Sequence, residues 1–313
     1  MIFQRIKGKA RVMAQELKWR LFSAKPTVQE VERLDILKKR INGLPPLVSD
    51  GTNTLDPWIK NRARLRSDIM RCDARNFLRW TVVNYTMFTV CKKVELDELM
   101  KSKKWSIWEK VLPETGIGNP RPYEHYEKSS GNLIHAAYHL DRFFGNSQLP
   151  FGDMNAIVEF GGGYGCMARL ISNLGFGGTY IIFDLPEFCA LQEYYLSSAG
   201  FKVFTEPTRE KGVVVLSSLQ DFKKQCSLIP ALDMFIATWS LSESPLELRK
   251  SILEALPPCP RILITYQEKF DGIDNIKYFG KDARTDRDLV WEDTPIVQMP
   301  GSHYLLGKAR RPV

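Results

Sequence analysis

Residues 158–165 read Val-Glu-Phe-Gly-Gly-Gly-Tyr-Gly, a glycine-rich run that directly follows a short apolar segment. The glycines at positions 161, 163 and 165 allow the chain to turn sharply and let the backbone approach a bound molecule closely. Residues 167–171 have helical character, so the first N–H groups of that helix would point at the same molecule. This order of strand, glycine turn and helix predicts an α/β unit that binds a nucleotide-like ligand.

The sequence from residue 156 onward alternates short apolar runs with helical segments. This pattern is typical of a parallel sheet that is covered by helices on both faces. The predicted strands cover residues 156–160, 180–183, 234–237 and 261–266, followed by a closing pair at 296–299 and 304–306. Residues 201–204 and 213–216 compete for one further strand position, and a hairpin insertion would accommodate both. We therefore assign residues 151–313 to one α/β domain.

The first 150 residues predict a helical region. Apolar residues at positions 2, 6, 10, 13, 17 and 21 share one helical face among basic residues, which predicts a basic amphipathic helix over residues 1–25. We expect this face to pack on protein, with a membrane surface as the alternative. A long helix is predicted from Asp56-Pro57 to about Lys93, and more helix at 96–111, before a loop at 113–122. Residues 56–145 would form a helical cap.

Composition and charge limit the functional classes to which the protein can belong. The 313 residues carry a formal charge of +8, and much of the basic excess precedes the glycine run. Nucleic acid, anionic lipid and acidic substrates therefore stay open as partners. No apolar run reaches the roughly 18 residues of a membrane span, and no signal-peptide pattern occurs. We expect a soluble cytoplasmic protein, with peripheral contact at the inner face of a membrane as the alternative.

The six cysteines and four histidines show no metal-ligand spacing. The cysteines form no Cys-x-x-Cys pair, so we expect reduced, buried thiols. His135 and His139 stand four residues apart on one helical face, but a metal site would need a third ligand that the sequence does not identify. We expect a partly exposed helix surface at both histidines and no bound metal.

Two acidic residues decide which cofactor suits the glycine run. Residues 163–168 also fit the dinucleotide fingerprint G-x-G-x-x-A. Asp184 ends the next strand and suits the ribose hydroxyls of either cofactor class. Glu159, at the end of the first strand, is unneeded for a pyrophosphate but suits a cofactor that carries an ammonium and a sulfonium. The pattern acid-x-Gly-x-Gly-x-Gly resembles motif I of class I S-adenosylmethionine-dependent methyltransferases, and the closing strand pair resembles the antiparallel last strand of that fold.

This resemblance implies a Rossmann-like sheet, mostly parallel with an antiparallel last strand, beside an N-terminal helical region. It also implies S-adenosyl-L-methionine as the cofactor. We expect the cofactor to contact Glu159, Gly161, Gly163, Gly165, Asp184, Leu185, Ser218, Thr238 and Trp239.

Four segments together resemble a narrower family, the sugar O-methyltransferases. They are residues 158–165, 183–187 with 190–197, 240–243 and 272–273. Upstream, only Gly118-Asn119-Pro120 is similar. In that family a histidine often precedes the Ser-x-Ser-Glu segment, where Trp239 stands here, so we expect an aromatic cover for the cofactor. The resemblance implies that the methyl acceptor is a hydroxyl of a saccharide or nucleotide sugar, within surface polysaccharide synthesis.

A hydroxyl is a poor nucleophile while it is protonated, so we expect a general base beside the acceptor. Glu243 follows the strand at 234–237 and lies at the carboxyl edge of the sheet, where ligands bind in open α/β folds. Its alternative role is to cap the helix that begins near Pro245. His303, expected in the turn between the last two strands, titrates near neutrality, and its alternative is a surface position. His125 is the third candidate, from a loop that precedes the sheet.

Three other functions stay open. A basic N-terminal half with interleaved tryptophans is also compatible with an RNA methyltransferase, although we expect no nucleic-acid partner. The second alternative is a non-catalytic, membrane-associated protein with a vestigial methyltransferase fold, in which the N-terminal helix carries the function. A nicotinamide-dependent enzyme is disfavoured by Glu159 and by the closing strand pair.

Overall fold

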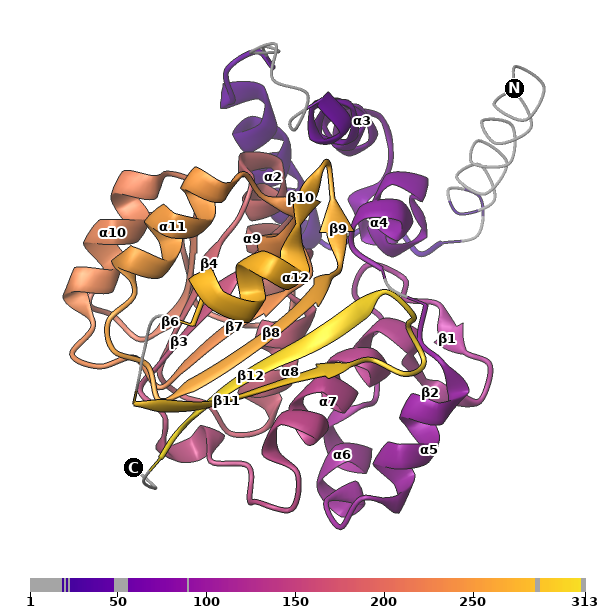
Figure 1. Cartoon of the computed structure of the whole chain (residues 1–313). Helices are drawn as coiled ribbons and strands as arrows, with labels where there is room; N and C mark the ends of the chain where they lie inside the picture. Colours follow the sequence, from indigo (N-terminus) through magenta and orange to yellow (C-terminus); the bar gives the residue numbers. More distant parts are fainter. Residues whose placement is uncertain are drawn as a thin grey trace.

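The computed structural model has a mixed α/β architecture (Figure 1). It describes residues 19, 21, 23–47, 56–88, 90–284 and 288–310. The basic amphipathic helix predicted over residues 1–25 therefore lies mostly outside the described residues. Within them, every helix is too short or too polar to span a lipid bilayer.

The centre of the molecule is an eight-stranded sheet with the strand order β11-β12-β8-β7-β3-β4-β6-β5. Its strands are β3 (Ala156–Phe160), β4 (Thr179–Phe183), β5 (Val203–Phe204), β6 (Gly212–Leu216), β7 (Met234–Thr238), β8 (Arg261–Gln267), β11 (Leu289–Pro295) and β12 (Ser302–Ala309). β12 is antiparallel to both of its neighbours, β8 and β11, whereas the other neighbouring pairs are parallel. The sheet is thus Rossmann-like and mostly parallel with an antiparallel last strand, which confirms the predicted fold class.

Helices cover both faces of this sheet. The helices of one face are α7 (Gly131–Phe144), α8 (Cys166–Asn173) and α9 (Pro186–Ser198), and those of the other are α10 (Leu219–Leu228) and α11 (Leu246–Ala255). Each face of the sheet carries an apolar core. In β3, Ile157 packs in the first core, under α7, α8 and α9, and Val158 packs in the second core, under α10 and α11. Both are fully buried, which explains why the strand reads as an unbroken apolar run.

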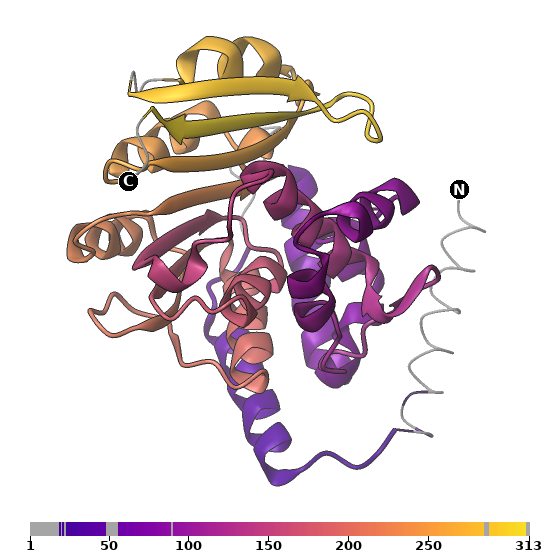
Figure 2. The same ribbon diagram turned by 90° about the horizontal axis from the view of Figure 1, so that it is seen from below.

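The N-terminal helices share the first of these two cores. They are α2 (Val28–Gly43), α3 (Asp56–Arg71), η1 (Ala74–Arg79), α4 (Thr81–Thr86), α5 (Lys93–Lys101) and α6 (Trp105–Val111), followed by the hairpin of β1 (Pro122–Tyr123) and β2 (Tyr126–Ser130). Figure 2 shows them gathered on one side of the molecule. Leu65, Phe77 and Trp108 are fully buried in the same apolar cluster as Ile157. The helices and the sheet face are therefore joined by one continuous core.

Short elements complete the chain. η2 (Phe151–Asp153) precedes the start of β3, and the others follow the carboxyl ends of β7 and β8. These are η3 (Ser240–Glu243), β9 (Lys269–Phe270), β10 (Ile273–Asp274), α12 (Asn275–Lys277) and η4 (Tyr278–Asp282). β9 and β10 form a two-stranded antiparallel hairpin of their own.

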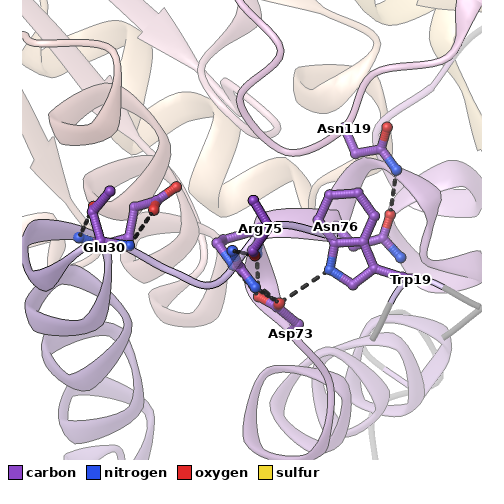
Figure 3. Close-up of polar contacts among 8 residues, drawn as sticks. Trp19, Glu30, Asp73, Arg75, Asn76 and Asn119 are labelled. Carbon is purple, nitrogen blue, oxygen red and sulfur yellow. Dashed lines mark hydrogen bonds and ion pairs between the residues drawn. The ribbon is translucent and has the colours of Figure 1, made fainter. Parts of the chain in front are cut away.

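The single helix predicted over residues 56–93 is wrong, because the chain breaks after Arg71. The carboxylate of Asp73 accepts a hydrogen bond from the Arg75 backbone N–H at 3.0 Å and so begins η1. Figure 3 shows that it also binds the Arg75 guanidinium and accepts from Trp19 Nε1 at 3.0 Å. Burial would raise the pKa of Asp73, but these hydrogen bonds outweigh it and hold the pKa below 3.8. Asp73 therefore ends one helix, starts the next and anchors the chain at Trp19.

Three further expectations about the elements are corrected. The helix predicted at 96–111 is two helices, because Ser102 is extended between α5 and α6. Residues 296–299 form the turn that precedes β12, and β11 is its partner strand, an edge strand whose Glu292 is exposed. Residues 203–204 and 212–216 are both strands of the main sheet, and they pair in parallel rather than as a hairpin.

Candidate active site

The glycine run forms the turn between β3 and α8. Gly161, Gly163 and Gly165 have φ angles of +74°, +59° and +96°, in the left-handed region that favours glycine. Gly161 also permits a close approach, because a Cβ there would lie 2.2 Å from Cβ of Ser240. The Ser240 hydroxyl donates to the carbonyl oxygen of Phe160. The end of β3 is therefore fastened to the start of η3.

Asp184 lies directly after β4, as predicted from the sequence. Its Oδ1 accepts from the Leu185 N–H at 2.7 Å, and its Oδ2 accepts from Gln192 Nε2 at 2.8 Å. The backbone of Gly163 also hydrogen-bonds to this carboxylate. Burial raises the pKa of Asp184 to about 7, although these hydrogen bonds favour the ionised form. The residue expected to bind ribose thus already lies against the glycine loop.

Glu159 is buried beneath the same loop, with 2% of its surface exposed. Its Oε2 accepts from the Tyr180 hydroxyl at 2.9 Å, and a Cβ on Gly162 would lie 3.1 Å from that oxygen. Burial raises the pKa of Glu159 to about 8, and the charge of Asp184 adds to the shift. Among the described residues, no lysine, arginine or histidine forms an ion pair with either carboxyl group. Two acidic groups without a cationic partner therefore flank the loop.

The other predicted cofactor contacts follow neighbouring strands at the same edge of the sheet. Leu185 is the N-cap residue of α9, and Thr238 ends β7. Ser218 is the N-cap residue of α10, where its hydroxyl accepts from the Asp221 N–H at 3.3 Å. Since β4, β6 and β7 run parallel to β3, their carboxyl ends meet at the glycine loop.

The helical region reaches the loop through the residues that follow α4. Cβ of Met87 lies 3.6 Å from the position that a Cβ on Gly163 would occupy. The ring of Phe88 stacks on Tyr164, with centroids 5.9 Å apart and an interplanar angle of 22°. The N-terminal part of the chain thus covers the loop at its centre.

Trp239 follows β7 with a φ of +60°, which is unusual for a bulky residue. Its backbone N–H donates to the Thr265 carbonyl at 2.8 Å, and its Nε1 donates to Ser302 Oγ at 3.3 Å. The indole stacks on the ring of His135, with centroids 5.5 Å apart and an interplanar angle of 20°. Contacts from β8, β12 and α7 therefore hold this strained residue in one orientation.

His135 and His139 belong to a buried chain of hydrogen bonds. His135 Nδ1 lies 2.8 Å from Glu95 Oε2, and the two Nε2 atoms lie 2.9 Å apart. His139 Nδ1 lies 2.7 Å from the Tyr304 hydroxyl. All four residues are at most 5% exposed. The prediction of a partly exposed helix surface is wrong, because α5 and β12 cover this face of α7.

The charge of Glu95 sets the direction of the first of these hydrogen bonds. Burial would raise its pKa, but bonding and attraction from His135 outweigh burial and hold the pKa below 4.5. With Glu95 ionised, His135 donates to it from Nδ1. Burial, together with His135, lowers the pKa of His139 well below 6.5. Within the described part of the chain, no three His, Cys, Asp or Glu side chains form a metal site.

Glu243 ends η3, and its Oε1 accepts a hydrogen bond from Gln267 Nε2 at 3.3 Å. Burial raises the pKa of Glu243, and this hydrogen bond opposes the shift. The alternative capping role is wrong, because α11 begins at Leu246 without any side-chain cap. Gln267 also accepts from Ser242 Oγ at 3.0 Å, and the fully buried Arg249 donates to the Ser242 carbonyl at 2.6 Å. A buried framework thus holds Glu243 at the sheet edge.

His303 is the second residue of β12 and not part of the turn. Its Nδ1 lies 3.3 Å from Asp293 Oδ1, and its Nε2 lies 3.4 Å from Glu268 Oε1. The ring stacks on Tyr266, with centroids 5.2 Å apart. Because Ser302 pairs with Gln267 at the end of β8, His303 lies near the same edge as Glu243.

His125 lies in the turn between β1 and β2. Its Nε2 is 3.4 Å from Glu124 Oε1, and its ring centroid is 5.4 Å from that of Tyr123. Both contacts are with chain neighbours, and they do not connect His125 to the glycine loop.

Sequence reasoning missed the side chains that hold the site together, namely Tyr180, Gln192, Ser240 and Gln267. Gln192 and Ser240 carried a signal, since they lie in the segments 190–197 and 240–243 that resemble the sugar O-methyltransferases. The other partners are brought together by strand register and by η3, which the sequence did not predict.

No family model and no curated protein matches the sequence. Among solved structures, an rRNA methylase from Streptococcus thermophilus is 12% identical with a TM-score of 0.39, over 57% of this chain and 96% of that one. The mitomycin 7-O-methyltransferase MmcR is 13% identical with a TM-score of 0.39, over 96% and 99%. A variant of MtNAS in complex with S-adenosylmethionine is 11% identical with a TM-score of 0.40, over 91% and 99%. At this similarity no substrate and no residue role transfers to this chain.

Proposed function

We propose that this protein is an S-adenosylmethionine-dependent methyltransferase that methylates a hydroxyl group of a sugar. The observation that supports it most strongly is a pair of carboxyl groups, the buried Glu159 and the partly buried Asp184, around a glycine loop at the carboxyl edge of the sheet. A cationic nucleoside would supply the positive charge that the described residues do not. A nicotinamide dinucleotide would bring a pyrophosphate, and like charges repel strongly in a buried site.

The residues around the loop fit the parts of this cofactor. Asp184 would accept hydrogen bonds from the ribose hydroxyls, and Glu159 would act on the cationic end from beneath the loop. Trp239 and Met87 would exclude water from the reacting groups. When bound, the cofactor supplies a methyl group on a sulfonium, which is a good leaving group.

The acceptor must lose a proton as its oxygen bonds to the methyl carbon and the carbon–sulfur bond breaks. Glu243 would take this proton, because burial raises its pKa and makes the carboxylate a stronger base than in water. Gln267 would orient that carboxylate through its amide. His303 is the second candidate base, since it lies at the same edge between Asp293 and Glu268.

A sugar hydroxyl as the acceptor is supported by the resemblance of residues 183–187, 190–197 and 240–243 to the sugar O-methyltransferases. The rigidly held indole of Trp239 adds a flat apolar surface of the kind on which a pyranose ring stacks. Nucleotide sugars, glycolipids and surface polysaccharides all carry such hydroxyls.

The test is an assay of the purified protein with S-adenosylmethionine labelled in its methyl group. Nucleotide sugars, glycan extracts and total RNA would be offered as separate acceptors, with Glu243→Gln as the matched inactive protein. We expect label in a carbohydrate fraction. Label in RNA with steep salt dependence would replace the sugar proposal by an RNA methyltransferase. Absence of cofactor binding in calorimetry would overturn the methyltransferase proposal itself.

A further inference from the structure

Gln192 of α9 is fully buried and bridges the two halves of the proposed cofactor site. Its Nε2 donates to the Gly163 carbonyl at 2.9 Å and to Asp184 Oδ2 at 2.8 Å. The backbone of Gly163 hydrogen-bonds back to the Asp184 carboxylate. The glycine loop, the carboxylate and the amide therefore close a small ring of hydrogen bonds.

Only one orientation of the Gln192 amide satisfies this ring. Both of its near neighbours, the Gly163 carbonyl and the Asp184 carboxylate, are acceptors, so the NH₂ group must face them. Oε1 is consequently buried without a hydrogen-bond partner among the described residues. An unsatisfied buried acceptor destabilises the fold, so this arrangement favours the site at the expense of stability.

We propose that Gln192 is a positioning residue that fastens the ribose-binding carboxylate of Asp184 to the glycine loop before the cofactor arrives. This inference rests on the proposed function. A carboxylate that is already fixed loses less side-chain entropy when the ligand binds, and so the ligand binds more tightly. The amide also brings no charge next to Asp184, which a glutamate of the same shape would do.

Two substitutions of Gln192 separate these effects. Gln192→Met keeps an unbranched apolar stem but removes both donated hydrogen bonds, so S-adenosylmethionine should bind roughly ten- to a hundredfold more weakly at every pH. Gln192→Glu places two carboxyl groups at hydrogen-bond distance, where they remain together only by sharing a proton. Its affinity should fall as the pH rises, because the shared proton is lost. The wild-type affinity should rise with pH, since ionised Asp184 accepts the ribose hydroxyls.

Gln225 of α10 provides the matched control. It is also fully buried, and its amide bridges the backbone of Thr208, with Oε1 2.7 Å from the Thr208 N and Nε2 3.0 Å from its carbonyl oxygen. Gln225→Met therefore loses two hydrogen bonds in the fold but none at the glycine loop. It should lower the free energy of unfolding and leave cofactor affinity and its pH dependence unchanged.

The experiment is calorimetry of S-adenosylmethionine binding to the full chain and these three variants, at about pH 6 and about pH 8.5. Amide hydrogen exchange of the loop without ligand is the second measurement, and Gln192→Met should exchange faster there than wild type. Opposite pH slopes of wild type and Gln192→Glu, with an unaffected Gln225→Met, support the proposal. If Gln192→Met binds the cofactor as tightly as wild type and its loop exchanges at the wild-type rate, the positioning role of Gln192 is overturned. The methyltransferase proposal would remain intact. A wild-type chain that binds no cofactor would refute the methyltransferase proposal instead.

Discussion

Replacing Glu159 by glutamine should change how the stability of the ligand-free protein depends on pH. The folded chain keeps the Glu159 proton up to about pH 8, whereas an unfolded chain releases it near 4.5. Between these values the folded state binds more protons than the unfolded state, so the free energy of unfolding falls as the pH rises. Glu159→Gln removes this group and should flatten the curve.

The size of the effect follows from the shift in pKa. A pKa that moves from 4.5 to about 8 corresponds to roughly 5 kcal/mol at about 1.4 kcal/mol per pH unit. The glutamine amide can still accept the hydrogen bond from Tyr180, so the two proteins should be almost equally stable at about pH 4, below the unfolded pKa of 4.5. At about pH 8.5 the variant should be the more stable protein by several kcal/mol.

Urea unfolding followed by far-UV circular dichroism at several pH values measures the difference directly. Groups distant from Glu159 titrate alike in both proteins and cancel, so the difference between the two curves reports Glu159 together with its coupling to Asp184. Tyr180→Phe is the control, because it removes the hydrogen bond that favours the ionised form and should steepen the pH dependence. Parallel curves for wild type and Glu159→Gln would refute the account of Glu159 as a buried, protonated carboxyl group.

Three other predictions test separate parts of the site. Asp184→Ala should weaken S-adenosylmethionine binding in calorimetry, and unchanged affinity would remove the ribose role. Glu243→Gln should lose about 10²- to 10⁴-fold in turnover with cofactor binding intact. His303→Ala should retain more activity than Glu243→Gln, and wild-type turnover in both variants would leave neither residue as the base. Burial lowers the pKa of His139, so its contribution to stability is present above 6.5 and is lost as the pH falls towards the folded pKa. His139→Gln should reduce the loss of stability between about pH 6.5 and 4.5 in urea unfolding, and an unchanged slope would contradict this.

The parallel strands and the glycine loop could be predicted because their signals are local. β3 matches the predicted range of 156–160, since helices on both faces require an apolar residue at each position. Gly161 and Gly163 adopt the left-handed conformations that a glycine run suggests. The position of Asp184 directly after β4 was predictable, because ligands of open α/β sheets bind at the carboxyl ends of the strands.

The buried histidine chain could not be predicted, because its partners are distant in sequence. Glu95 is 40 residues from His135, and Tyr304 is 165 residues from His139. The helical face that carries both histidines is covered by α5 and β12, and no local pattern records that packing. The break after α3 has a local cause instead, because Asp73 accepts a hydrogen bond from the Arg75 backbone N–H two residues later and so begins η1.

β12 presents His303 and Tyr304 to opposite faces of the sheet. His303 stacks on Tyr266 in one core, whereas Tyr304 meets His139 in the other. Since side chains alternate along a strand, a slip of one residue would exchange the two. The turn at 296–301 therefore sets which side chains of β12 face each core. A register shift by an even number of residues would keep the two faces of β12 as they are, and a shift by an odd number would exchange them.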